Sequence, residues 1–335
     1  ILESTPNGSG GMYYNQWNLW KKEGDLAPFK GYFCAWHQHY PEHPERWINK
    51  EIKLNEKELE LKELYGLENY HLAWRRWKIN ESCDGSEEVF DVEYPSDDIS
   101  CFLSGSDQVF ASKTLKLQES FVKDPSFVGV LRSEGKKKVS FYGDKKGVLQ
   151  VWELPKGGVS YVIGVDTSTG YSKDYCVAVV LNKATGEQVA MLRSHIPVDE
   201  WAEHIYNLGH FYNYAWVCPE VNSYGLSVVT DLVKMGYTKV YKRTDYAQGS
   251  NSALGKLYGF YTSSTTKPSL IKDLSAGLKD GKFRVRSRVI LEELSSFIQV
   301  STKTGRGVKL EARPDCFDDC VIALALSVHM SLQLQ

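Results

Sequence analysis

Two short apolar runs in the second half of the chain each end at an acidic residue. Residues 161–165 are followed by Asp166, and residues 215–218 are followed by Glu220 after a single proline. Runs of four or five apolar residues between turn-forming residues are typical of strands buried inside a sheet. The pattern therefore predicts two buried strands, each with a carboxylate at or just past its carboxyl end.

The neighbouring segments predict the rest of an α/β layout. Strand-like runs at 176–181 and 188–193 flank a turn at 182–186, which predicts a hairpin. Further elements are predicted in the following order: helices at 198–211 and 226–235, a strand at 239–241, a helix from Pro268 to near Gly281, a strand at 283–286, and helices at 291–298 and 318–330. Three antiparallel strands followed by alternating helices and strands predict a mixed α/β sheet with helices on both faces.

The last predicted helix is apolar on nearly every side, because residues 321–326 are all apolar. Such a helix belongs in the interior, packed flat on a sheet. Two aspartates, Asp318 and Asp319, open it. Helix N-termini favour carboxylates, so capping alone accounts for one of the two aspartates. It does not account for the second.

These acidic residues predict a metal-dependent chemistry. Asp166, Glu220 and the pair Asp318–Asp319 are expected at one edge of the sheet, where sites of α/β proteins gather. Carboxylates placed together repel one another unless a cation lies between them. Hard oxygen ligands select Mg²⁺ or Mn²⁺, and two such ions can hold the attacking and leaving oxygens of a phosphodiester.

The charge distribution points to a polyanionic partner. A net charge of −2 over 335 residues conceals an acidic segment, residues 1–110, with 11 Lys and Arg against 20 Asp and Glu. Residues 234–313 carry 16 Lys and Arg against 6 Asp and Glu. Such a basic stretch fits a nucleic acid, although surface solvation is an equal alternative for any one side chain. The candidate phosphate contacts are Arg243, Lys267, Arg306 and Arg313.

Composition and organisation narrow the class of protein. Hydrophobic residues make up 42% and charged residues 24%, as in ordinary globular proteins, and no apolar run could span a bilayer. Seven scattered cysteines without a CxxC pair indicate a reducing compartment rather than a disulfide framework or zinc ribbon. Three segments separate: acidic residues 1–110 with a long helical pattern at 44–77, a variable linker at 111–158, and the α/β segment at 159–335. The start at Ile1 suggests a piece of a longer chain.

Several motifs, in the same order along the chain as in the family, carry a resemblance. Three segments resemble the acidic motifs of the RNase H-like nuclease domain of tailed-phage large terminase subunits. They are the Gly-Val-Asp sequence at 164–166 and the segments 217–222 and 317–325. Phe317 stands where that family commonly has a His. Residues 1–8 resemble the coupling motif near the end of the terminase ATPase domain, and 73–76, 93–96 and 101–105 resemble the segment that joins motor and nuclease.

The resemblance implies an RNase H-like nuclease that cuts concatemeric viral DNA during genome packaging. Asp166, Glu220 and Asp319 would hold two Mg²⁺ or Mn²⁺ ions, with Asp318 a close fourth ligand. Asp174 resembles an accessory acidic position, with surface charge as the alternative. Ser4, Thr5 and Pro6 would belong to the coupling motif. The implied partners are double-stranded DNA, the portal protein and the small terminase subunit, in an oligomeric motor in the host cytoplasm.

Two other function classes fit parts of the sequence. Residues 164–170 also resemble the phosphate-binding hairpin of actin-like and sugar-kinase phosphotransferases, but no second glycine-rich turn follows. A non-catalytic DNA-docking module fits the basic stretch but not an intact acidic set, and a resolvase of the same fold would share the chemistry. A P-loop is absent, since 277–283 has one residue too few between its glycines, so ATPase activity is not expected from this chain.

Overall fold

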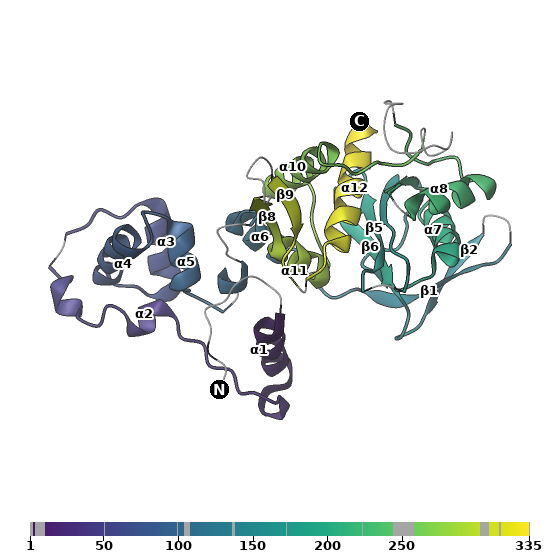
Figure 1. Ribbon diagram of the computed structural model, residues 1–335. Coiled ribbons are helices and arrows are strands. Elements are labelled where there is room, and N and C mark those ends of the chain that lie inside the picture. The colour runs from purple at the N-terminus through teal and green to yellow at the C-terminus, as the bar shows by residue number, and fades with distance from the viewer. Residues whose placement is uncertain are drawn as a thin grey trace. The chain divides into compact units, whose positions relative to one another are not determined.

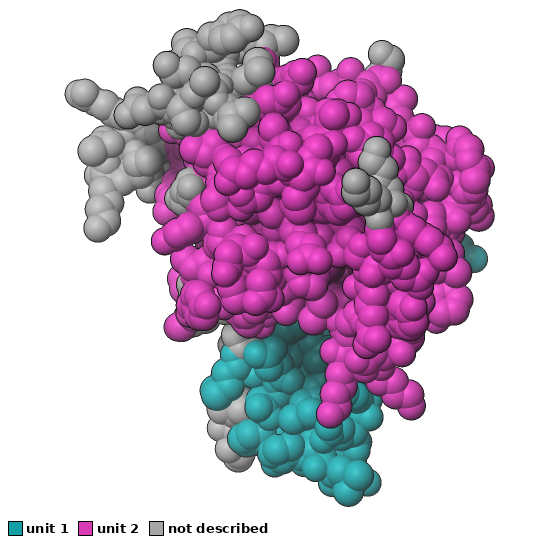
Figure 2. Space-filling model, turned by 90° about the vertical axis from the view of Figure 1, so that its right-hand side faces the viewer, with its two compact units in different colours: residues 1–112 teal, residues 113–335 magenta. Residues whose placement is uncertain are grey.

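The structure is a computed structural model that describes most of the chain. The described residues are 3, 11–49, 51–98, 100–103, 108–135, 138–171, 173–222, 224–243, 258–301, 308–314 and 316–334. The chain divides into two compact units, residues 1–112 and 113–335, coloured separately in Figure 2. This boundary lies close to the one predicted at residue 110. No helix in the described part of the chain has the length and apolar character needed to cross a membrane.

The first unit is helical in its described residues. It contains α1 (Gly11–Glu23), η1 (Gly24–Leu26), α2 (Trp36–His39), η2 (Pro44–Arg46), α3 (Glu56–Tyr65), α4 (Asn69–Ser82), α5 (Glu87–Glu93) and η3 (Ser100–Leu103). Its core is largely aromatic and centres on Trp36, Trp74 and Phe90. The Trp36 and Trp74 rings stack with their centroids 5.5 Å apart.

The helical pattern predicted over residues 44–77 resolves into separate helices. Asn55 starts α3, because its side chain accepts a hydrogen bond from the Glu58 N–H while the Glu58 side chain accepts one from the Asn55 N–H. Gly66 ends α3 in the left-handed region, with φ 66°. The turn at this glycine lets α4 start afresh, so the continuous pattern does not become one long helix.

The second unit contains the mixed α/β sheet. Its elements are α6 (Ser112–Glu119), β1 (Phe127–Ser133), β2 (Val139–Gly143), β3 (Leu149–Val151), β4 (Tyr161–Asp166), β5 (Cys176–Asn182), β6 (Gln188–Ser194), α7 (Val198–Phe211), β7 (Trp216–Pro219), α8 (Gly225–Lys234), α10 (Thr266–Lys279), α11 (Arg288–Ser296), β8 (Phe297–Ser301), β9 (Val308–Ala312) and α12 (Asp319–Gln333). Figure 1 labels most of them.

The sheet has the strand arrangement of an RNase H-like fold. Seven strands lie in the order β2-β1-β3-β6-β5-β4-β7. Strands β4, β5 and β6 form an antiparallel meander, and β7 adds alongside β4 in the parallel direction. A parallel neighbour requires a crossover, which α7 supplies between β6 and β7. The predicted fold class is confirmed.

The prediction of a linker at 111–158 is wrong. Strands β1, β2 and β3 in this segment extend the sheet beyond β6, and Leu149 and Val151 are buried against the core. The segment is rich in Lys, Ser and Gly, and its outer strand β2 is half-buried or exposed throughout. Edge strands of this kind lack the continuous apolar run that marks a buried strand.

Three other local predictions changed. Residues 239–241 and 283–286, predicted as strands, contribute only the single bridges Val217↔Val240 and Glu187↔Arg284. The helix predicted at 291–298 starts earlier and ends at Ser296, where β8 begins and pairs with β9.

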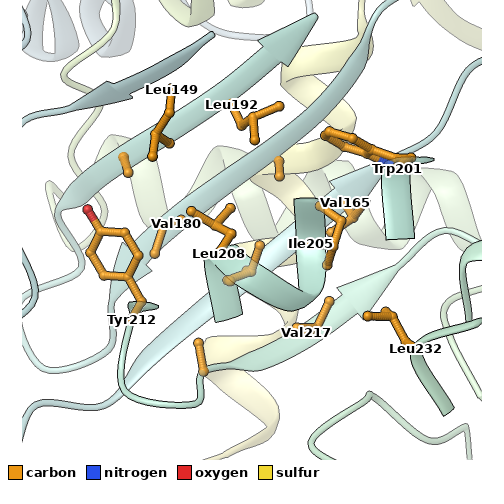
Figure 3. Close-up of a cluster of buried hydrophobic side chains, with 14 of the residues drawn as sticks. Leu149, Val165, Val180, Leu192, Trp201, Ile205, Leu208, Tyr212, Val217 and Leu232 are labelled. Atoms are coloured by element: carbon orange, nitrogen blue, oxygen red, sulfur yellow. The ribbon is translucent and has the colours of Figure 1, made fainter. Parts of the chain in front are cut away.

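Helices cover both faces of the sheet. Alternate residues of β4 and β5, including Val165 and Val180, point to one face and pack against Trp201, Ile205 and Leu208 of α7 (Figure 3). Helix α12 lies on the opposite face against β4, β5 and β7, as Figure 1 shows in yellow. The alternation follows from the two-residue period of a strand.

Gly164 sets how closely α12 approaches β4. Its N–H donates a hydrogen bond of 2.7 Å to the Ser327 hydroxyl of α12. A Cβ at this position would lie 2.0 Å from the Ala323 carbonyl oxygen. Any side chain at residue 164 would therefore push the helix and the strand apart.

We expect Gly164→Ala to lower the free energy of unfolding by about 1–3 kcal/mol or more, because overpacking displaces a buried helix. Gly143→Ala is the matched control, since Gly143 also lies in a strand but a Cβ there would meet nothing within 4 Å. Urea denaturation followed by circular dichroism measures both. Equal stability of the two variants would contradict the close packing.

Candidate functional site

Two carboxylates lie at the carboxyl edge of the parallel pair β4 and β7. Asp166 is the last residue of β4, and Glu220 directly follows β7. Because the two strands run in the same direction, their carboxyl ends meet at one edge of the sheet. The Glu220 N–H donates a hydrogen bond to the Val165 carbonyl oxygen, with 2.9 Å between N and O. Because Val165 directly precedes Asp166, this bond places Glu220 beside Asp166.

A third carboxylate reaches this edge from α12. Asp319 is the first residue of α12 and only 8% exposed. Its Oδ2 accepts a hydrogen bond of 2.9 Å from the Tyr175 N–H, just before β5 begins. Strand β5 runs antiparallel to β4, so its start lies beside Asp166, which pairs with Val177.

The charges at this edge are poorly compensated. Burial raises the pKa of Asp166 well above its usual range, and the nearby carboxyls of Glu220, Asp319 and Asp318 raise it further. A hydrogen bond to Glu220 also raises the pKa of Asp166. Burial raises the pKa of Asp319 to about 7, against the lowering effect of the Tyr175 N–H.

Asp318 has a cationic partner that Asp319 lacks among the described residues. The Lys267 ammonium lies 3.2 Å from Asp318 Oδ2 and 5.4 Å from the Phe297 ring centroid. Asp318 occupies the N-cap position of α12, but its side chain makes no capping hydrogen bond. Asp318 therefore does not cap the helix by a hydrogen bond from its side chain.

Asp174 is exposed and lies close enough to act on the site. Its charge is among the causes that raise the pKa of Asp319. The Ser168 hydroxyl donates to the Asp174 carbonyl oxygen at 2.9 Å, which ties the loop after β4 to the start of β5.

The donor set fits a hard divalent cation in its chemistry. Asp166, Glu220, Asp318 and Asp319 offer carboxylate oxygens only, which are the ligands that such a cation prefers. Within the described ranges, however, no three His, Cys, Asp or Glu side chains stand close enough to hold an ion as they are. Occupancy would require these carboxyl groups to draw together around a cation.

The candidate DNA contacts divide between described and undescribed positions. Arg243 is half-buried, with its guanidinium 5.9 Å from the Tyr261 ring centroid. Arg313 is half-buried after β9, and its N–H donates to the Ser296 carbonyl oxygen. Lys267 pairs with Asp318, at the acidic edge itself. Arg306 and the coupling-motif residues Ser4, Thr5 and Pro6 lie outside the described residues.

Two charged residues next to the site were not predicted. Glu293 of α11 is buried, and its Oε2 accepts a hydrogen bond of 2.7 Å from the Cys320 N–H in the first turn of α12. Arg193, at the end of β6, lies 3.5 Å from Glu293 Oε1. The signal in the sequence was a glutamate on the same helical face as Ile290 and Leu294, which are apolar.

The comparisons with known proteins returned terminase nucleases among solved structures. The large terminase nuclease of thermophilic phage G20c with bound magnesium is 21% identical, covering 67% of this chain and 98% of that chain at a TM-score of 0.48. The large terminase nuclease domain of Thermus phage P74-26 is 21% identical, covering 64% and 93% at 0.44. The large terminase of another thermophilic bacteriophage is 12% identical, covering 53% and 41% at 0.39.

No family model matches the chain, and no curated protein matches it. Because the TM-scores lie below 0.5, these structural likenesses do not by themselves assign a family or an activity to the chain.

The charge on Asp319 should make stability depend on pH. Its pKa is about 7 in the folded chain and about 3.9 in an unfolded one. Between these values the folded state binds the extra proton, so this contribution to stability falls as pH rises from about 4 to about 7. Without added divalent metal, Asp319→Asn should raise the free energy of unfolding at pH 8 by up to about 4 kcal/mol.

At pH 4.5 the gain should be much smaller, because Asp319 is then protonated in the folded chain. Thermal melts at both pH values, with the exposed Asp124→Asn as control, measure the difference. A gain that is the same at pH 4.5 and pH 8 would mean that the Asp319 charge is compensated.

Proposed function

We propose that the second unit of this chain is a divalent-metal-dependent endonuclease of the large-terminase type, which cuts concatemeric viral DNA during packaging. The observation that carries the proposal is the meeting of Asp166, Glu220 and Asp319 at one edge of an RNase H-like sheet. The acidic motifs that surround these residues support the same family.

Asp166, Glu220 and Asp319 would hold two Mg²⁺ or Mn²⁺ ions, with Asp318 as a fourth ligand. Bound ions of this kind activate a water molecule and stabilise the charge on the leaving oxygen of a phosphodiester. The Tyr175 N–H orients the Asp319 carboxylate. Cation binding would require the ionised form of Asp166 and would therefore oppose the raised pKa of its carboxyl. Asp174 would be the accessory acidic position, since its charge acts on Asp319.

The two aspartates at the start of α12 differ in their suitability as ligands. Lys267 already neutralises Asp318 at 3.2 Å. Asp319 is held by a neutral N–H, so its negative charge remains available to a cation. We therefore assign Asp319 as the principal ligand of the pair. Lys267 is then placed where it can meet a DNA phosphate next to the metal ions.

DNA binding would rest on the basic stretch at 234–313, with Arg243, Lys267, Arg306 and Arg313 as phosphate contacts. Residues 1–110 would be the end of an ATPase domain, with Ser4, Thr5 and Pro6 in its coupling motif. By the same resemblance, the portal protein and small terminase subunit would be partners in an oligomeric motor in the host cytoplasm.

Asp166→Asn should reduce metal-dependent cutting on the order of 100-fold or more, because a ligand charge is lost while the shape is kept. Nicking of supercoiled plasmid in Mn²⁺ measures the rate. The variant should have the same circular dichroism spectrum and the same affinity for DNA as the parent. Asp124→Asn is the matched control on the surface. A variant that cuts like the parent would remove Asp166 from the site.

DNA affinity should fall steeply with salt and depend little on sequence, because lysine and arginine contacts release counterions from phosphates. Arg243→Ala should make the slope of log K against log salt shallower by roughly 0.9, the loss of one phosphate contact. Lys22→Ala, exposed in the first unit, should leave it unchanged. Two unrelated duplexes titrated across a salt series give both results, and a strong preference for one sequence at every salt would argue against this mode of binding.

A further inference from the structure

A buried glutamate replaces the missing cap at the start of α12. Glu293 is 5% exposed, and its Oε2 lies 2.7 Å from the Cys320 nitrogen. A helix begins with N–H groups that have no partner inside the helix, and a carboxylate there also meets the positive end of the helix dipole. Glu293 comes from α11, so it anchors the residue directly after Asp319 to a different element.

The same glutamate holds an arginine over an aromatic ring. Glu293 Oε1 lies 3.5 Å from an Arg193 terminal nitrogen. The Arg193 guanidinium carbon stands 3.4 Å from the centroid of the Tyr175 ring and 5.7 Å from that of Phe317. A guanidinium stacked on a ring at this distance fixes both partners, because the planar group lies along the face.

These contacts connect to one another around Asp319. Tyr175, under the arginine, donates its N–H to Asp319 Oδ2 at 2.9 Å. Phe317, two residues before Asp319, packs edge-on against Tyr175 with the ring centroids 5.4 Å apart. The side chain of Asp319 is thus held through Tyr175, and its backbone through Glu293, with Arg193 joining the two.

Stability alone is a weak reason for this arrangement. Removing two charges from water is costly, and apolar residues of similar volume often stabilise a protein as well as a buried ion pair does. What an ion pair adds is a specific geometry. In metal sites, groups that orient the ligands commonly change metal affinity by about 10–100-fold when they are removed.

We propose that Arg193 and Glu293 form a positioning pair that orients the Asp319 carboxylate for divalent metal. The assignment of Asp319 as a ligand rests on the proposed nuclease function. Neither member of the pair need touch DNA or metal. The pair acts through Tyr175 on the side-chain oxygen and through Cys320 on the helix start.

The test compares Arg193→Met with the parent chain by three measurements. Mn²⁺ affinity by calorimetry should weaken about tenfold, and the turnover number for plasmid nicking should fall while the KM for DNA stays constant. Hydrogen exchange at the Tyr175 amide, followed by NMR on tyrosine-labelled protein, should become about tenfold faster as its bond to Asp319 loosens. Arg193→Lys keeps a charge beside Glu293 but loses the planar stacking on Tyr175. Its three measured values should lie between those of the parent and those of Arg193→Met.

Arg75→Met is the matched control in the first unit. Arg75 is also buried, lies 5.0 Å from the Phe90 ring centroid and pairs with Asp91 at 3.4 Å. It should lower thermal stability but leave Mn²⁺ affinity and Tyr175 exchange at the parent's values.

If Arg193→Met does not fold, Glu293→Gln decides by the same measurements, since glutamine keeps an acceptor for the Cys320 N–H and loses only the charge. A variant with lower stability but unchanged Mn²⁺ affinity and unchanged Tyr175 exchange would overturn the proposal. The ion pair between Arg193 and Glu293 would then have a structural role only. A parent chain that neither binds Mn²⁺ nor nicks DNA would refute the nuclease function instead, and Tyr175 exchange would still test the positioning.

Discussion

The contact between Gly164 and α12 is the constraint on which the acidic edge depends. With no side chain at residue 164, the backbone of β4 comes close enough for its N–H to reach the Ser327 hydroxyl. The helix then lies flat across β4, and its first residue extends to the carboxyl end of the strand. Asp319 lies near Asp166 because of this approach, although the two are 153 positions apart along the chain. An apolar helix and one glycine thereby determine where the charges meet.

Once the carboxylates are together, the distribution of cations decides what they can do. Two cations that lie beside this edge are already paired with acids, Lys267 with Asp318 and Arg193 with Glu293. Burial raises the pKa of Asp166 well above the usual range, and the neighbouring carboxyls raise it further. A proton and a divalent cation are alternative ways to relieve the same repulsion. Metal ions bound there, as we propose, would supply the positive charge that relieves this repulsion.

The helices and strands that a continuous local run of apolar residues marks could be predicted from the sequence. Apolar runs that end at Asp166 and Glu220 mark buried strands, and the apolar segment after Asp319 marks a buried helix, because each is enclosed on both sides. Strands β1 and β2 escaped prediction since they lie at the edge of the sheet, where half-buried and exposed positions tolerate polar residues. Strand β3 is buried but only three residues long, too short for an apolar run to mark it. Residues 239–241 look like a strand, yet they pair at one position only, because pairing length depends on the partner and not on propensity.

The carboxylates expected at this edge could be listed from the sequence. The charged residues that lie around them, Glu293 and Arg193, could not. Glu293 lies 27 residues from Cys320 and 100 from Arg193, so no local pattern connects the three. The one local sign was a glutamate on the apolar face of α11, where an unpaired charge would be strongly unfavourable. Such a residue must have a partner, and the partner must come from an element packed on that face. In this fold α11 packs against α12, so a buried acid on α11 points toward the start of α12 and therefore toward Asp319.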